Sequence, residues 1–190
     1  MLDYMECVKK ALDIATKAHE GQKDKGGNDY IGHPIAVSAM CSYLSDQIVA
    51  LLHDVVEDTS VTLDEIRMEI PDDEIIDAID AMTRRKDEPR EEYLVRVKKN
   101  PIARRVKIFD LTHNSDLSRI KNPTEKDFER VAQYQKEIEY LKSNADKEYV
   151  WQEIDYKLKE INPNYVPFEL LSMDEQERLI DLSFDWDEEK

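Results

Sequence analysis

The stretch QIVALLHDVVED, residues 47–58, is apolar in its first half and acidic in its second. We predict a short helix over residues 47–58 at the centre of a helical bundle, buried on most sides at its start because the apolar half leaves no polar face. His53 and Asp54 end the apolar run. Because residues four apart share a helix face, Glu57 follows His53 and Asp58 follows Asp54 in two parallel rows. The stretch therefore predicts charged groups in the interior of the bundle.

The rest of the chain also predicts an all-α protein. Of its 190 residues, 37% are charged and only 4 are Gly, a composition typical of helix-rich proteins. Apolar residues three and four apart mark three further helices: Met5, Val8, Leu12, Ala15 and His19; Ile75, Ile76, Ile79 and Met82; Phe128, Val131, Tyr134, Ile138 and Leu141. The length suits a core of roughly 140 residues with an appendage. We expect a domain over residues 1–142 and an acidic helical extension over 143–190, packed on it.

The charge of the chain bears on its partners. The net charge is −16, and residues 143–190 hold 14 Asp and Glu against 5 Lys and Arg. Such a field repels nucleic acid backbones and anionic lipids, so no nucleic acid polymer is expected as a partner. Small anionic substrates remain compatible with local clusters of basic residues.

Two cysteines and the lack of long apolar runs bear on the compartment. Cys7 and Cys41 lie in predicted helices, where buried free thiols are the usual finding, and a reducing cytoplasm fits them. The apolar runs are far shorter than the roughly 20 residues that span a bilayer, and the first residues lack a signal-peptide pattern. We expect a cytoplasmic protein with no membrane contact; the oligomeric state is left open, a homo-oligomer included.

The buried acidic turn also predicts a ligand. Burying two or three carboxylates without a cation costs several kcal/mol each, so the position calls for a metal or for strongly raised pKa values. Imidazole and carboxylate ligands suit Mn²⁺ or Fe²⁺ better than a thiolate-type Zn²⁺ site. A His-Asp pair alone is more often a packed core feature. Here, however, GHP lies upstream of the pair and VKIFDLTHN lies downstream.

Four motifs together resemble the HD superfamily, and more closely the hydrolase domain of the RelA/SpoT alarmone enzymes and their small stand-alone relatives. They are AHEGQ (18–22), YIGHP (30–34), LLHDVVEDT (51–59) and DLTHN (110–114), and the likeness runs from about Ala11 to Leu141. The resemblance implies an all-α HD bundle with one divalent ion, Mn²⁺ before Fe²⁺, Zn²⁺ or Mg²⁺. It implies as metal ligands His33, His53, Asp54 and Asp110.

The resemblance also assigns roles around the metal. Glu57 and Asp58 would orient or deprotonate the attacking water, although an acidic helix end would look the same. A pyrophosphate ester needs further cations, and basic residues cluster at 23–25, 84–86, 104–107 and Arg130. The residues predicted to bind substrate are Lys23 and Lys25 in the glycine loop and, by the resemblance, Lys86, Asn114, Arg130 and Tyr134.

The expected activity is metal-dependent hydrolysis of a phosphorylated or pyrophosphorylated nucleotide, with guanosine 3′,5′-bis(diphosphate) 3′-pyrophosphohydrolase as the leading candidate. Asp24 and Leu111 stand where the family commonly has basic residues, and both changes remove positive charge. The alternatives are another small nucleotide phosphohydrolase, or a catalytically idle HD protein that senses a nucleotide or scaffolds a partner. A two-metal site would need further histidines, and only His19 and His113 remain.

Overall fold

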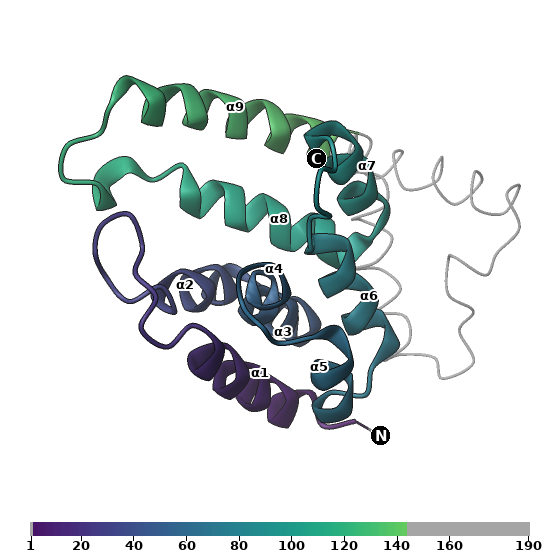
Figure 1. Ribbon diagram of the computed structural model, residues 1–190. Coiled ribbons are helices and arrows are strands. Elements are labelled where there is room, and N and C mark those ends of the chain that lie inside the picture. Colours follow the sequence, from purple (N-terminus) through teal and green to yellow (C-terminus); the bar gives the residue numbers. More distant parts are fainter. Residues whose placement is uncertain (1, 144–190) are drawn as a thin grey trace, which may run out of the picture. The chain divides into compact units, whose positions relative to one another are not determined.

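The structure, a computed structural model, describes residues 2–143, which form α-helices and one short 3-10 helix (Figure 1). In chain order these are α1 (Tyr4–Ala18), α2 (Gly32–Met40), α3 (Leu44–Leu52), α4 (Val55–Asp58), α5 (Leu63–Glu69), α6 (Asp73–Met82), α7 (Arg90–Lys99), α8 (Pro101–Asn114), η1 (Leu117–Arg119) and α9 (Glu125–Lys142). Within residues 2–143 the only β pairing is an isolated bridge between Lys23 and Asp29. The all-α prediction is confirmed.

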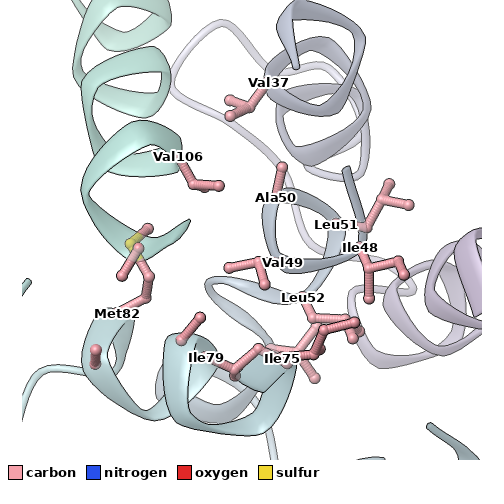
Figure 2. Packing of buried hydrophobic residues seen from close by; sticks show 14 of the residues in the cluster. Val37, Ile48, Val49, Ala50, Leu51, Leu52, Ile75, Ile79, Met82 and Val106 are labelled. Carbon is pink, nitrogen blue, oxygen red and sulfur yellow. The ribbon is translucent and has the colours of Figure 1, made fainter. Parts of the chain in front are cut away.

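Helix α3 lies at the centre of the core. It packs against α1, α2, α6 and α8, and its residues 48–52 are at most 3% exposed. Figure 2 shows Val37 of α2, Ile79 of α6 and Val106 of α8 around these side chains. The predicted buried central helix is confirmed, because a segment with no polar face can only be accommodated where neighbours cover every side.

The prediction of one continuous helix over residues 47–58 is wrong. Helix α3 ends at Leu52 and α4 begins at Val55, with His53 and Asp54 between them. In a continuous helix these two side chains would point about 100° apart. At the break Asp54 has φ −102° and ψ −7°, and its carboxylate lies 2.9 Å from His53 Nε2. The break thus lets two adjacent polar side chains reach the same interior point.

The buried face of α1 differs from the predicted one. Met5 and Leu12 are 57% and 37% exposed, so their assignment to the buried face is wrong. The buried row consists of Cys7, Ala11, Ala15 and His19, each four residues after the last. Because most of these side chains are small, α1 can approach α3 closely. Ala15 and His19 belong to the buried face, as predicted.

Helices α6 and α9 differ in how well their apolar pattern predicts burial. All four predicted residues of α6 are buried. In α9, Leu141 is buried but Phe128 is 58% exposed, against the prediction. An ion pair helps to hold this helix: Glu137, 2% exposed, accepts from Arg90 of α7 at 2.6 Å. The spacing of apolar residues does not predict a polar contact of this kind.

Other predictions concern thiols, membrane spans and the extension. Cys7 and Cys41 are free and buried, as predicted. Among the described helices, none has the length and apolar character needed to cross a membrane. The predicted extension over 143–190, with its helices, lies outside the described residues except for Ser143.

A buried ion pair joins α3 to α8, and breaking it is expected to be costly. Arg105 donates to both carboxylate oxygens of Asp46 at 2.6 Å, and Asp46 is 1% exposed. Arg105→Leu leaves a buried carboxylate without its cation, so we expect the free energy of unfolding to fall by about 3–5 kcal/mol in urea titrations. The exposed Arg67–Asp73 pair provides the control Arg67→Leu, expected to cost about 1 kcal/mol or less. Equal losses would contradict the prediction.

Candidate metal centre

Four predicted metal residues meet where three elements converge. His33 lies in the first turn of α2, His53 and Asp54 lie between α3 and α4, and Asp110 lies on α8. The ligand atoms of His33, His53 and Asp54 are all within 4.8 Å of one another, a spacing that could hold a metal ion. Asp110 Oδ1 lies 3.1 Å from His33 Nε2 and 3.8 Å from His53 Nε2.

Hydrogen bonds behind the imidazoles fix which nitrogen faces the centre. His53 Nδ1 lies 2.7 Å from the Ala50 carbonyl oxygen, which can only accept, so Nδ1 carries the proton of the neutral ring. His53 Nε2 is buried and has no hydrogen-bond partner of acceptable geometry among the described residues. His33 Nδ1 lies 2.8 Å from His113 Nδ1. Donation from His33 to His113 would leave its Nε2 lone pair facing the centre.

Each carboxylate of the centre has its own outer partners. Tyr30 donates its hydroxyl to Asp54 Oδ2. Lys107 Nζ donates to Asp110 Oδ2 at 2.8 Å, and Asn114 Nδ2 donates to Asp110 Oδ1 at 2.6 Å. These bonds hold the two carboxylates in place and balance part of their charge.

The electrostatics favour ionised carboxylates. Burial works to raise the pKa of Asp110, but the Lys107 ammonium and His33 outweigh burial and hold that pKa well below its usual value. Burial acts likewise on Asp54, yet the nearby positive charge of protonated His53 lowers its pKa to about 2. Burial disfavours the imidazolium of His53, and Asp54 more than offsets this, so the pKa of His53 rises to about 9. In the cation-free protein a protonated His53 therefore balances the acidic centre.

Two further carboxylates lie on α4, next to the centre. Glu57 and Asp58 are both exposed. Glu57 Oε2 accepts from the Arg84 backbone N–H at 2.8 Å, which ties α4 to the loop after α6. Partial desolvation and the neighbouring charges of Asp54 and Glu57 raise the pKa of Asp58. An exposed carboxylate with a raised pKa can accept a proton from a water molecule.

A pocket of about 230 Å³ opens beside His33 and Tyr30. Five of the six predicted substrate residues line it: Lys23, Lys25, Asn114, Arg130 and Tyr134. Lys86 does not line it. The pocket and the centre share His33, so a molecule in the pocket lies next to the candidate ligands.

Several predicted cations are already engaged. Arg105 pairs with Asp46, as described, and Lys107 with Asp110. Arg84 donates to the Glu88 carbonyl at 2.7 Å, and Arg85 to Asp80 at 2.5 Å. These four basic residues therefore stabilise the fold or the centre. The basic side chains of the pocket come from the glycine loop and α9, where Lys23 pairs with Asp29 at 2.5 Å and Arg130 with Asp127 at 2.7 Å.

The two departures from the family pattern have different consequences. Asp24 lines the pocket, so its negative charge does lie on the substrate side, together with Asp116. Leu111 is 1% exposed and belongs to the hydrophobic core. Leu111 does not line the pocket, because the residue after Asp110 points about 100° away on the helix.

Sequence reasoning missed two contacts and left one undecided. Tyr30 stands within the YIGHP motif, but its bond to Asp54 depends on two elements far apart in the chain. Lys107 precedes Asp110 by three residues, a spacing that puts both on one helix face and could have identified the pair. His113, one of the two histidines that were not assigned to the metal, contacts His33.

The comparisons with known proteins identify the family. The fold and the site define a class of protein: an all-helical bundle with a buried histidine–aspartate centre. The HD domain family matches residues 11–139, and the chain belongs to this family.

Individual relatives are similar over parts of the chain. A guanosine-3′,5′-bis(diphosphate) 3′-pyrophosphohydrolase of Borreliella burgdorferi is 46% identical over 79 residues, 40% of this chain and 12% of that protein. A GTP pyrophosphokinase of Streptomyces coelicolor is 30% identical over 119 residues, 56% of this chain and 14% of that protein. The chain thus spans a small part of the length of these relatives.

One solved structure supports the fold. It belongs to a metazoan ortholog of SpoT described as hydrolysing ppGpp, with a TM-score of 0.52 at 20% sequence identity. The match covers 75% of this chain and 95% of that one. At this identity the likeness concerns the fold alone.

Proposed function

We propose that this chain is a divalent-metal-dependent phosphohydrolase, and that its substrate is guanosine 3′,5′-bis(diphosphate), from which it releases the 3′-pyrophosphate. The carrying observation is the convergence of His33, His53, Asp54 and Asp110 beside a pocket with three basic side chains. The name of the Borreliella burgdorferi relative supports the choice of substrate.

The four residues fit a single cation. Two imidazole nitrogens and two ionised carboxylates provide a mixed ligand set that suits Mn²⁺, which we propose as the ion. The buried Nε2 of His53, which lacks a hydrogen-bond partner of acceptable geometry, supports the assignment. In the described residues one such group of three or more ligands occurs, which supports one metal. When bound, the cation would polarise a phosphoryl oxygen and lower the pKa of water.

The chain's own residues would supply the remaining chemistry. Glu57 and Asp58, on the turn after the ligands, would orient the attacking water and take its proton. The water oxygen bonds to the phosphorus next to the 3′-oxygen, and the bond between that phosphorus and the 3′-oxygen breaks. The 3′-oxygen takes up a proton, so the products are guanosine 5′-diphosphate and pyrophosphate. Lys25 and Arg130, which line the pocket, would bind phosphate oxygens.

The direct test is hydrolysis of guanosine 3′,5′-bis(diphosphate) by the full chain with Mn²⁺, followed by pyrophosphate release. We expect turnover with Mn²⁺, its loss in a chelator, and its return when Mn²⁺ is restored. Failure to release pyrophosphate from this nucleotide, with Mn²⁺ bound, would refute the proposed substrate.

A second substrate has a specific observation in its favour. Asp24 and Asp116 both line the pocket and place negative charge beside Lys23, Lys25 and Arg130. A less phosphorylated nucleotide would meet less repulsion there. A panel of guanosine and adenosine phosphates, assayed for phosphate as well as pyrophosphate release, distinguishes the two. An idle sensor would bind a nucleotide from this panel and turn over none.

Cation binding is expected to tighten as pH rises. In the cation-free protein Asp54, against the effect of burial, raises the pKa of His53 to about 9. Below that pH a proton must leave His53 before its nitrogen can bind a metal. The apparent Kd for Mn²⁺ should therefore fall about tenfold per pH unit from about pH 6 to about pH 8, measured by calorimetry. A Kd independent of pH over this range would contradict the prediction.

We also propose that the chain works in the cytoplasm. The support is chemical: Cys7 and Cys41 are buried free thiols, a state that a reducing compartment maintains. Fractionation of cells that produce the chain tests this proposal.

A further inference from the structure

The AHEGQ motif at the end of α1 has no part in the proposed metal or substrate contacts. His19 ends α1 with its N–H bonded to the Ala15 carbonyl, and it is 2% exposed. Gly21 has φ +78°, a left-handed conformation that favours glycine. This reversal lets Gln22 fold back, and its N–H bonds to the His19 carbonyl at 3.0 Å. The turn thus places the side chains of His19 and Gln22 next to each other.

The Gln22 amide links His19 to α4. Gln22 Nε2 donates to the backbone carbonyl of Asp58 at 3.2 Å. A carbonyl can only accept, so the orientation of the amide is fixed and Oε1 faces His19 Nδ1 at 2.8 Å. His19 Nδ1 is then the donor. His19 Nε2 is buried with no hydrogen-bond partner in the described residues, so the ring is hydrogen-bonded through Nδ1 to Gln22.

The His19 ring also reaches the metal centre through Tyr30. The two ring centroids are 4.8 Å apart, and Tyr30 in turn lies 5.8 Å from His33. The Tyr30 hydroxyl donates to Asp54. His19 therefore contacts Tyr30, which donates to the candidate ligand Asp54, and Gln22, which donates to the carbonyl at the end of α4.

Helix α4 needs such support because it has only four residues, Val55–Asp58. A single turn has few helical hydrogen bonds of its own, and its last carbonyls lack helical donors. Glu57 is tied to Arg84, and Gln22 donates to the Asp58 carbonyl at the other side of the turn. The placement of both carboxylates relative to Asp54 depends on these two external contacts.

We infer that His19 and Gln22 are positioning residues, which fix the turn carrying Glu57 and Asp58 relative to the metal ligand Asp54. They are neither ligands nor proton acceptors in this role. The inference rests on the proposed function for its catalytic consequence, but its structural consequence is independent of any substrate.

The test uses Gln22→Glu in the full chain. A carboxylate keeps the acceptor for His19 and loses the donor to Asp58. In metal-free protein we expect the amides of Asp58 and Thr59, which bond to the carbonyls of Asp54 and Val55, to exchange about tenfold faster. With Mn²⁺ and substrate we expect kcat to fall by about tenfold or more, with the Kd for Mn²⁺ unchanged.

Gln47→Glu is the matched control. Gln47 Nε2 also donates to a backbone carbonyl, that of Cys41, at 3.0 Å, and it lies on α3 outside the proposed machinery. We expect neither faster exchange in α4 nor a lower kcat from it. Exchange in Gln22→Glu equal to wild type, or the same exchange change from Gln47→Glu, would overturn the inference.

A second pair of variants separates the ring of His19 from its donor. His19→Asn retains an N–H donor for Gln22, and His19→Phe retains only the ring. We expect slow exchange in α4 to persist in His19→Asn and to be lost in His19→Phe; the reverse order would overturn the inference. If wild type hydrolyses no nucleotide, the proposed function fails while the exchange measurements still decide this inference.

Discussion

Asp54→Ala is expected to remove Mn²⁺ binding at the centre and to lower kcat/KM more than about a thousandfold. A metal contributes several kcal/mol of transition-state stabilisation, and each 1.36 kcal/mol corresponds to a factor of ten. Asp54 is the carboxylate nearest to His53, at 2.9 Å. Removal of the Asp54 carboxylate also removes the acceptor for the Tyr30 hydroxyl. Calorimetry with Mn²⁺ and pyrophosphate release measure the two effects.

The same variant should also shift the titration of His53. Burial works to lower the pKa of His53, and Asp54 contributes most, ahead of Asp110, to raising it to about 9. In Asp54→Ala the imidazole should therefore lose its proton at lower pH. Proton NMR of the His53 ring measures this without metal. Asp13→Ala, an exposed aspartate on α1, is the control and should leave binding, turnover and titration unchanged. Retained Mn²⁺ affinity in Asp54→Ala would contradict the ligand assignment.

Apolar patterning predicted the core well where burial is complete. Residues 48–52 and the apolar face of α6 are buried as expected, because removing apolar side chains from water stabilises the fold. Prediction failed where small side chains or polar contacts determine which residues are buried. Ala11 carries little hydrophobic signal and was not among the residues predicted to be buried, yet it lies on the buried face of α1. Phe128 fits the apolar pattern of α9 but is exposed.

The family resemblance identified the four candidate ligands, but it did not give their geometry. Helical periodicity assumes a continuous helix, and α3 and α4 are separated at His53 and Asp54. Pairings across the fold, such as Tyr30 with Asp54, depend on tertiary contacts that one sequence does not encode locally. Counting basic residues also overestimates the charge available to a substrate, since Arg105 and Lys107 are bound to buried carboxylates.

Asp58→Asn is expected to lower kcat by about a hundredfold to ten-thousandfold while the Kd for Mn²⁺ stays near the wild-type value. General base catalysis accounts for an effect of this size, and the amide keeps the shape of the side chain without its proton affinity. Glu57→Gln retains an acceptor for the Arg84 N–H, so the fold of α4 should survive. The variant with the larger loss identifies the base, and wild-type kcat in both would contradict this role for α4.

Asp58→Asn should lower kcat but raise the thermal stability of the protein. Desolvation and the charges of Asp54 and Glu57 raise the pKa of Asp58 in the folded protein above its unfolded value. The folded state therefore holds the Asp58 proton more tightly, so ionisation of this carboxylate destabilises the fold as pH rises through the raised pKa. Asp58→Asn removes that penalty, and its Tm in metal-free protein at neutral pH should exceed the wild-type Tm. The difference should vanish in acid, where wild-type Asp58 is protonated. Asp13→Asn is the control, and a Tm gain of equal size from it would contradict the electrostatic origin.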